Sequence, residues 1–264
     1  QGIDPELRFE QMNRVVEVVE NCNQIPVHPR HPWAGSLAYT AFSGSHQDAI
    51  KKGFDARQPG DPWQMPYLPI DPQDIGCSYE AVIRVNSQSG KSGSAWLIEQ
   101  NHGLKLPRGL QQDFSQHVQQ ATDSDGKEMT HHALWQLFRT RYGLQAQPAL
   151  LDYQSASQQD GQLSLQATLR HHGETRRLQG QGNGLLSAAA SGLSALFRQP
   201  FMIKDYHEHT LGARSDSRSV AYIRCVFPQG ESYWGVGIDN DVARASLQAL
   251  CNALSAADQA GGRK

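Results

Sequence analysis

Two short stretches in the first third of the chain carry side chains that could exchange protons with a substrate. His46 follows Ser45 in a pattern that predicts a short helix with Ser45 as its amino-terminal cap. The positive end of a helix disfavours an imidazolium ion, so a histidine in the first turn can accept a proton. Tyr67 lies between Pro66 and Pro69, on a stiff segment that would present its phenol to a substrate. The alternative interpretations are a surface histidine and an aromatic anchor.

A glycine-rich run near residue 180 is the second candidate site. Gly180, Gly182 and Gly184 come directly before a predicted apolar helix over residues 185–197. Glycines let a backbone approach a ligand closely, and the exposed N–H groups of a helix start can bind a carboxylate. The small residues over 188–192 leave space for an aliphatic side chain or for another helix. On the sequence alone, ligand binding and close helix packing in a dimer are equally well supported.

Three groups of histidines invite a metal-binding interpretation. His207 and His209 would face the same side of a strand, but a metal would need a third ligand. Adjacent histidines point in different directions, so we expect the other pairs to face solvent separately. These pairs are His131-His132 and His171-His172. We therefore expect no metal site in this chain.

The charge balance and one failed motif exclude two classes of partner. Lysine and arginine number 24 against 26 aspartate and glutamate residues, a net charge of −2 with both signs interspersed. This distribution lacks the basic surface that nucleic acids or anionic membranes require. Gly90-Lys91-Ser92 resembles the end of a phosphate-binding loop, but Val85 stands where that loop needs glycine. We expect no nucleotide site.

Cysteine spacing and apolar run lengths indicate the compartment. The four cysteines lie far apart and form no CxxC pair, so we expect reduced, mostly packed thiols. They are Cys22, Cys77, Cys225 and Cys251. No apolar run approaches the roughly 20 residues of a membrane span, and the first residues lack the layout of a signal peptide. These features predict a soluble cytoplasmic protein.

The first helix predicted in the 264-residue chain suggests that more polypeptide precedes it. Asp4 is a potential cap and Pro5 a potential first helical residue. An apolar stripe follows at Phe9, Met12, Val16 and Val19. Because such a stripe needs a cover, the simplest explanation is a fragment whose missing part packs against this helix.

The rest of the chain predicts an α+β protein. Residues 25–76 are irregular around one short helix near 47–52, and residues 79–142 carry helical periodicity. The last part contains a weak duplication, in which Asp152-Tyr153 recurs as Asp205-Tyr206, 53 residues later. Each copy predicts three strands and a helix, and the helices would cover the apolar faces of the sheets.

Three phrases in the first third of the chain resemble the linker region of 2-isopropylmalate synthases. They are Pro26-Val27-His28-Pro29-Arg30-His31-Pro32-Trp33, the run from Thr40 to Ile50, and the run from Gln64 to Pro72. The resemblance extends over essentially the whole chain. It implies four parts: a terminal helix of an absent catalytic barrel (1–27), two linker subdomains (28–78 and 79–145), and a leucine-binding regulatory domain (146–264) with two βββα units.

Enzymes of that family condense acetyl-CoA with 2-oxoisovalerate in the committed step of leucine synthesis. The resemblance implies a homodimer, a divalent metal (Mg or Mn) held by the absent barrel, and no cofactor in this chain. It also implies that His46 and Tyr67 serve the active site of the neighbouring subunit. By itself, the chain should lack turnover.

The resemblance further implies a leucine site at the dimer interface. The expected leucine-binding residues are Gly180, Gly182, Asn183, Gly184, Leu185, Ala188, Ala189, Asp205 and Tyr206. Two alternatives remain open at this point. One is a stand-alone amino-acid-binding regulatory or dimerisation module. The other is part of a related citramalate or homocitrate synthase.

Overall fold

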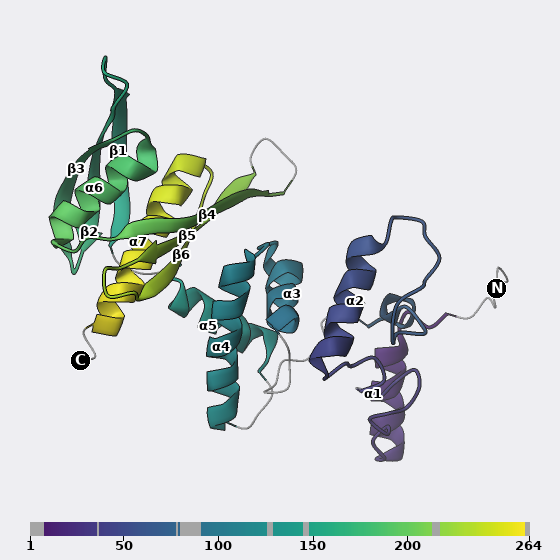
Figure 1. The fold of residues 1–264 in the computed structure, drawn as a ribbon. Helices are drawn as coiled ribbons and strands as arrows, with labels where there is room; N and C mark the ends of the chain where they lie inside the picture. Colours follow the sequence, from purple (N-terminus) through teal and green to yellow (C-terminus); the bar gives the residue numbers. More distant parts are fainter. Residues whose placement is uncertain are drawn as a thin grey trace. The chain divides into compact units, whose positions relative to one another are not determined.

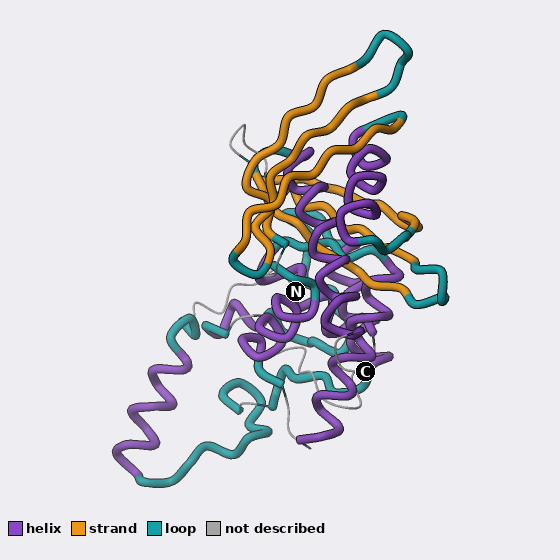
Figure 2. The backbone as a smooth tube through the Cα atoms, turned by 90° about the vertical axis from the view of Figure 1, so that its left-hand side faces the viewer, coloured by secondary structure: helices purple, strands orange, loops and turns teal. Residues whose placement is uncertain are grey.

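A computed structural model describes residues 8–35, 37–77, 79, 91–125, 129–144, 148–212 and 217–261 (Figure 1). The chain forms two compact units, which we consider separately. The first comprises residues 1–101 and 111–134, and the second comprises residues 102–110 and 135–264. All named strands, drawn in orange in Figure 2, lie between residues 149 and 239 in the second unit.

The helices outside the strand region differ in how much they bury. They are α1 (Met12–Asn23), α2 (Gly44–Ala56), the short 3-10 helix η1 (Pro72–Ile75), α3 (Lys91–His102), α4 (Arg108–Asp125) and α5 (His131–Arg141). No residue of α1 is buried, and its valines Val15, Val18 and Val19 are 52%, 54% and 41% exposed. The predicted cap at Asp4 and Pro5 lies outside the described residues. An apolar face of α1 is thus uncovered within the described chain.

Helix α3 lies in the stretch 79–142 that was expected to be helical, but its own residues carry no apolar stripe, and its burial explains why. Its residues Ala95 to Ile98 are consecutive and each is at most 4% exposed. These four consecutive residues point to nearly every side of one helical turn, so the segment has no apolar stripe with a 3.6-residue period. The predicted steps of α4 and α5 are confirmed, because Leu110, Phe114 and Phe138 are fully buried. The failed phosphate-loop motif falls mostly outside the described residues.

The second unit contains the two predicted βββα copies. The first copy is β1 (Ala149–Ser157), β2 (Leu163–His171), β3 (Glu174–Gly182) and α6 (Leu185–Phe197). The second is β4 (Met202–Leu211), β5 (Arg218–Val226), β6 (Ser232–Asp239) and α7 (Val242–Gly261). Each sheet is antiparallel in the order of the chain. Helix α6 packs on the first sheet and α7 on the second (Figure 1).

The duplication extends to an irregularity in the strand register. The first strand of each copy has a bulge, between Leu150 and Asp152 and between Ile203 and Asp205. The two bulges are 53 residues apart, the same spacing as the two Asp-Tyr pairs. Tyr153 and Tyr206 are therefore structural counterparts.

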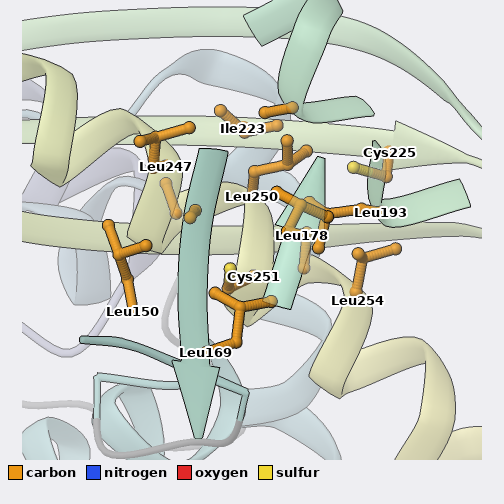
Figure 3. Packing of buried hydrophobic residues seen from close by; sticks show 14 of the residues in the cluster. Leu150, Leu169, Leu178, Leu193, Ile223, Cys225, Leu247, Leu250, Cys251 and Leu254 are labelled. Atoms are coloured by element: carbon orange, nitrogen blue, oxygen red, sulfur yellow. The ribbon is translucent and has the colours of Figure 1, made fainter. Parts of the chain in front are cut away.

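One hydrophobic core joins the two copies. Leu150, Leu169 and Leu178 of the first sheet meet Ile223 of the second sheet and Leu250 of α7 in one cluster (Figure 3). Because each copy contributes to this core, we expect the copies to fold together. Two cysteines, Cys225 and Cys251, lie inside it, and burial raises the pKa of each thiol to about 12.

The second sheet differs from the prediction of one apolar face. On β5 the residues from Val220 to Ile223 are all fully buried. Helix α7 covers one face, and on the other His209 stacks on Tyr222, with ring centroids 5.7 Å apart. The segment 102–110 adds to this cover, since a Cβ at Gly109 would lie 2.9 Å from the Trp234 ring. Among the described residues, no helix is both long and apolar enough to cross a membrane.

Candidate functional site

The structure brings His46 and Tyr67 together. Their ring centroids lie 4.1 Å apart with planes inclined by 31°. His46 is in the first turn of α2, whose cap is Ser43 and not the predicted Ser45. The helix therefore starts at Gly44 and is longer than predicted, but His46 keeps its place in the first turn. Both side chains are exposed, Tyr67 by 62%.

Tyr67 occupies a strained position in a tight turn. Pro66 and Tyr67 are the central residues between Met65 and Leu68, and the Leu68 N–H donates to the Met65 carbonyl at 3.4 Å. The φ angle of Tyr67 is +62°, where turns of this kind favour glycine or asparagine. Met65 and Leu68 are 8% and 3% exposed. The buried flanks anchor the turn while its tip presents the phenol.

Three contacts hold this turn in place beside α2. A Cβ atom at Gly53 would lie 2.8 Å from the Pro66 ring and would overlap the Met65 sulfur, so glycine allows the close approach. The Trp63 indole N–H donates to the Leu68 carbonyl at 2.7 Å. The Arg57 guanidinium lies over the Trp63 ring at 4.9 Å. The arrangement positions a phenol and an imidazole side by side, a pair suited to proton transfer.

A second candidate site is a groove of about 440 Å³ where α6 and α7 begin. It is lined by Asn183, Gly184, Leu185, Leu186, Ser187, Tyr206, Glu208, Val242, Ala243 and Ser246. The Tyr206 hydroxyl contacts the Glu208 carboxylate and lies 2.9 Å from the Ser246 hydroxyl. Burial and the hydrogen bond to Glu208 raise the pKa of Tyr206. The phenol therefore stays protonated near neutral pH and can donate a hydrogen bond.

The amino terminus of α6 has no side-chain cap. Its N-cap residue, Gly184, has φ −174°, and a Cβ atom there would meet no atom within 4 Å. The first N–H groups of a helix lack backbone partners and carry partial positive charge. This end of α6 thus faces the groove with capacity for an anion.

The counterpart of this site in the other half of the duplication is filled by the protein itself. Tyr153, the counterpart of Tyr206, donates to the Asp241 carboxylate at 2.5 Å. The other Asp241 oxygen accepts from the Ala243 N–H at 2.8 Å and so caps α7. Asp241 stands directly before α7 as Gly184 stands directly before α6. The groove keeps the corresponding tyrosine, Tyr206, but Gly184 stands where the capping aspartate would be.

Only part of the predicted leucine-binding set lines the groove: Asn183, Gly184, Leu185 and Tyr206. A Cβ atom at Gly180 would overlap the Ala188 carbonyl, and one at Gly182 would lie 2.6 Å from the Ala188 N–H. These two glycines therefore let α6 pack directly on β3. Ala188 and Ala189 are fully buried in the core, so the space that we expected beside them is filled.

Asp205 also lies away from the groove. It alternates with Tyr206 along β4, so the two side chains point to opposite faces. The Asp205 carboxylate pairs with Arg224 at 2.6 Å. Sequence reasoning missed Glu208, Ser246 and Val242, although Glu208 stands two residues after Tyr206 and thus shares its face. The other two come from α7, and only the packing brings them to the groove.

The histidine predictions had mixed outcomes. His209 Nε2 lies 3.1 Å from the Gly103 carbonyl and 3.4 Å from the Lys105 N–H, so this nitrogen is already engaged. The prediction that His171 and His172 diverge was wrong, because their ring centroids are 4.1 Å apart. His172 has φ +50°, which turns its side chain away from the strand alternation.

Two family models match the chain. The first, described as alpha-isopropylmalate synthase, post-catalytic domain-like, matches residues 36–99. The second, described as the LeuA allosteric (dimerisation) domain, matches residues 128–257. The first match falls within the expected linker parts, whereas the second begins at residue 128, inside the expected linker subdomain 79–145. The division at 27, 78 and 145 stays a prediction.

Curated relatives agree with both models. A 2-isopropylmalate synthase of Marinomonas sp. (strain MWYL1) is 54% identical over 259 residues, 96% of this chain and 46% of the relative. Those of Rhodospirillum rubrum and Pseudomonas putida (strain GB-1) are 46% and 48% identical over 98% and 97% of the chain. The chain thus spans about half the length of these relatives. The chain belongs to the 2-isopropylmalate synthase family, of which it carries the post-catalytic region and the LeuA allosteric (dimerisation) domain.

Proposed function

We propose that this chain is the carboxyl-terminal part of a homodimeric, cytoplasmic enzyme that condenses acetyl-CoA with 2-oxoisovalerate to 2-isopropylmalate. The proposal rests on relatives that are named 2-isopropylmalate synthase and match nearly the whole chain. In this reaction a base removes a methyl proton from the acetyl group, and the resulting enolate attacks the keto carbon. His46 and Tyr67 would assist these proton transfers in the active site of the neighbouring subunit.

The divalent metal of the reaction, Mg or Mn, would be bound by a barrel that corresponds to the part of the relatives not matched by this chain. The histidine pair of β4 does not fit it, because His209 is engaged with the backbone of residues 103 and 105. The chain alone would therefore not turn over substrate.

Leucine is proposed as the effector, bound in the groove at the start of α6. Its carboxylate would take the place that the Asp241 side chain takes at α7, between helix N–H groups and a tyrosine hydroxyl. The Tyr206 hydroxyl donates to Glu208 in this structure and would turn its proton to the leucine carboxylate, and Glu208 would then accept from the leucine ammonium. The isobutyl group would contact Leu185, Leu186 and Val242. This position differs from the one first expected, beside Ala188. The observation that carries this proposal is a difference between the two copies. Helix α6 begins without a side-chain cap beside Tyr206, whereas α7 is capped by Asp241, which also accepts from Tyr153.

The test is to supply the missing carboxylate within the chain. Gly184→Asp places an aspartate at the position that corresponds to Asp241. An aspartate is favoured there and φ −174° is open to any residue. We expect the variant to remain folded and to bind leucine at least tenfold more weakly by calorimetry, a loss of ~1.4 kcal/mol or more.

Gln158→Asp is the control, since it adds the same charge at an exposed residue between β1 and β2 whose φ angle is not positive. It should bind leucine as the wild type does. Unchanged leucine affinity in folded Gly184→Asp would place the effector elsewhere.

A further inference from the structure

A cluster of histidines and an aspartate lies away from both sites described above. One potential ligand atom each from His171, His172 and Asp258 lies within 4.8 Å of the other two. It is the one group of three or more potential metal ligands that the described ranges contain. Nothing in the proposed reaction or in leucine binding uses these residues.

The β2–β3 turn explains why two adjacent histidines converge. His172 and Gly173 are the two residues between the strands, with φ +50° and +81°. Positive φ at both positions is the geometry of a tight two-residue hairpin. It brings the rings of His171 and His172 to a centroid distance of 4.1 Å. An asparagine would be the usual first residue of such a turn, so a histidine there places an imidazole at some conformational cost.

The third potential ligand comes from the other half of the duplication. Asp258 lies near the end of α7, and its carboxylate is 3.9 Å from His172 Nε2. The His172 and Asp258 side chains are 74% and 69% exposed, so an ion could reach them and keep a water ligand.

His171 is more enclosed than its two neighbours. Its ring packs edge-on against Phe197, and its Nδ1 is buried without a hydrogen-bond partner among the described residues. In most buried histidines a hydrogen bond fixes the ring nitrogen that carries the proton. Here the described protein supplies none to Nδ1, so this nitrogen has no fixed partner.

We propose that His171, His172 and Asp258 form a site for a divalent transition-metal ion of the zinc class, with water completing the coordination. Two imidazoles and one carboxylate suit zinc, whereas magnesium and calcium prefer oxygen ligands. The nearby charges of Glu174 and Arg176 pair with each other at 3.3 Å, so the positive charge of Arg176 is compensated. The bound ion would join the hairpin of the first copy to the helix of the second.

The experiment uses the untagged chain after treatment with a chelator, because a histidine tag would bind the ion. We expect calorimetry with Zn²⁺ to give one site per chain and thermal unfolding to shift upward with Zn²⁺ concentration, as for any ligand that binds the folded state. His172→Ala and Asp258→Asn each remove one exposed ligand and should weaken binding at least tenfold. With Co²⁺ as a probe, the visible absorption of the wild type should be absent in the double variant.

His207→Ala is the control for non-specific imidazole binding, since His207 is exposed on β4. It should bind Zn²⁺ as the wild type does. Equal Zn²⁺ affinity in the wild type and the folded His172→Ala/Asp258→Asn double variant would overturn the proposal. Loss of the site in His207→Ala alone would assign the ion to β4 and would overturn it too. The outcome is independent of leucine binding, which all four variants should retain.

Discussion

At the scale of single residues, the candidate sites depend on backbone conformations that residue type alone does not reveal. Tyr67 and His172 both have positive φ, +62° and +50°, and both have a ring beside a neighbouring histidine. A non-glycine residue in this region costs of order 1–3 kcal/mol and persists only where the surrounding structure enforces it. In each case the strained backbone places an aromatic ring beside a histidine.

The strain at Tyr67 can be tested by relieving it. Tyr67→Asn should raise the free energy of unfolding by up to ~1 kcal/mol, because asparagine accepts positive φ more readily and Tyr67 is 62% exposed. Urea denaturation of the chain measures this change. Tyr67→Phe keeps the ring and the strain, so it should leave stability close to the wild type. Equal stability of Tyr67→Asn and the wild type would show that the turn stores no strain.

The Tyr153–Asp241 hydrogen bond should make stability depend on pH. It is the largest cause that raises the pKa of Tyr153, from 10.0 to about 12. The unfolded chain releases this proton near pH 10 while the folded chain retains it, so the stabilisation is complete below pH 10 and is lost between pH 10 and about 12. The same bond lowers the pKa of Asp241 from 3.8, so a second loss is expected below pH 3.8.

Comparison with Tyr153→Phe isolates this effect from the other tyrosines. The stability difference between wild type and variant should be constant near neutral pH and should shrink as pH rises through the window from 10 to about 12. Chemical denaturation at several pH values gives the two curves. A difference that stays constant across the window would contradict the proposed hydrogen bond.

At the scale of secondary-structure elements, the duplication places helix backbones directly on strands. Gly180 faces the Ala188 carbonyl and Gly237 faces the Ala245 carbonyl, so the same contact recurs 57 residues later. A side chain at either position would separate helix from sheet. Close packing of helix on sheet therefore explains Gly180 and Gly182. It does not explain Gly184, whose Cβ position is open.

This difference predicts opposite outcomes for substitutions only a few residues apart. Gly180→Ala and Gly237→Ala should each lower the free energy of unfolding by about 1–3 kcal/mol or more, because backbone must move to admit the methyl group. Gly184→Ser should leave stability unchanged or raise it, since its Cβ position is open and serine is a favourable cap. Thermal and urea unfolding provide both measurements. Equal tolerance of all three substitutions would refute the packing assignment.

At the scale of the whole molecule, the chain corresponds to about half of its relatives. Two exposed features are suited to contact with a partner surface. They are the uncovered valines of α1 and the His46–Tyr67 pair. We propose that the amino-terminal part of the same enzyme covers α1 and that the barrel of the second subunit receives the His46–Tyr67 pair.

Mixed dimers of the full-length enzyme test this arrangement. His46→Ala should lower turnover by about 10²- to 10⁴-fold without affecting dimerisation, as for loss of a positioned acid or base. Mixing it with a subunit whose barrel is inactive should restore part of the activity, because one barrel then meets an intact His46. His31→Ala is the control and should keep wild-type turnover. If the mixture stays inactive although mixed dimers form, each linker serves its own barrel.

The sequence by itself determined the α+β class, the duplication and the bounds of α6. The spacing of apolar residues along a helix or strand reflects which of its faces is buried, so it can be recognised locally. A repeat 53 residues apart can likewise be recognised without knowing how the two copies pack. The first-turn position of His46 followed from capping residues in the same way, although the cap proved to be Ser43.

Only the tertiary structure decided which of these residues meet. Asp241 lies 88 residues from Tyr153 and Asp258 lies 86 residues after His172, and no periodicity links such positions. The convergence of His171 and His172, and the approach of Tyr67 to His46, depend on the sign of single φ angles. That sign is set by the closure of each turn against its neighbours and not by the residue that occupies it.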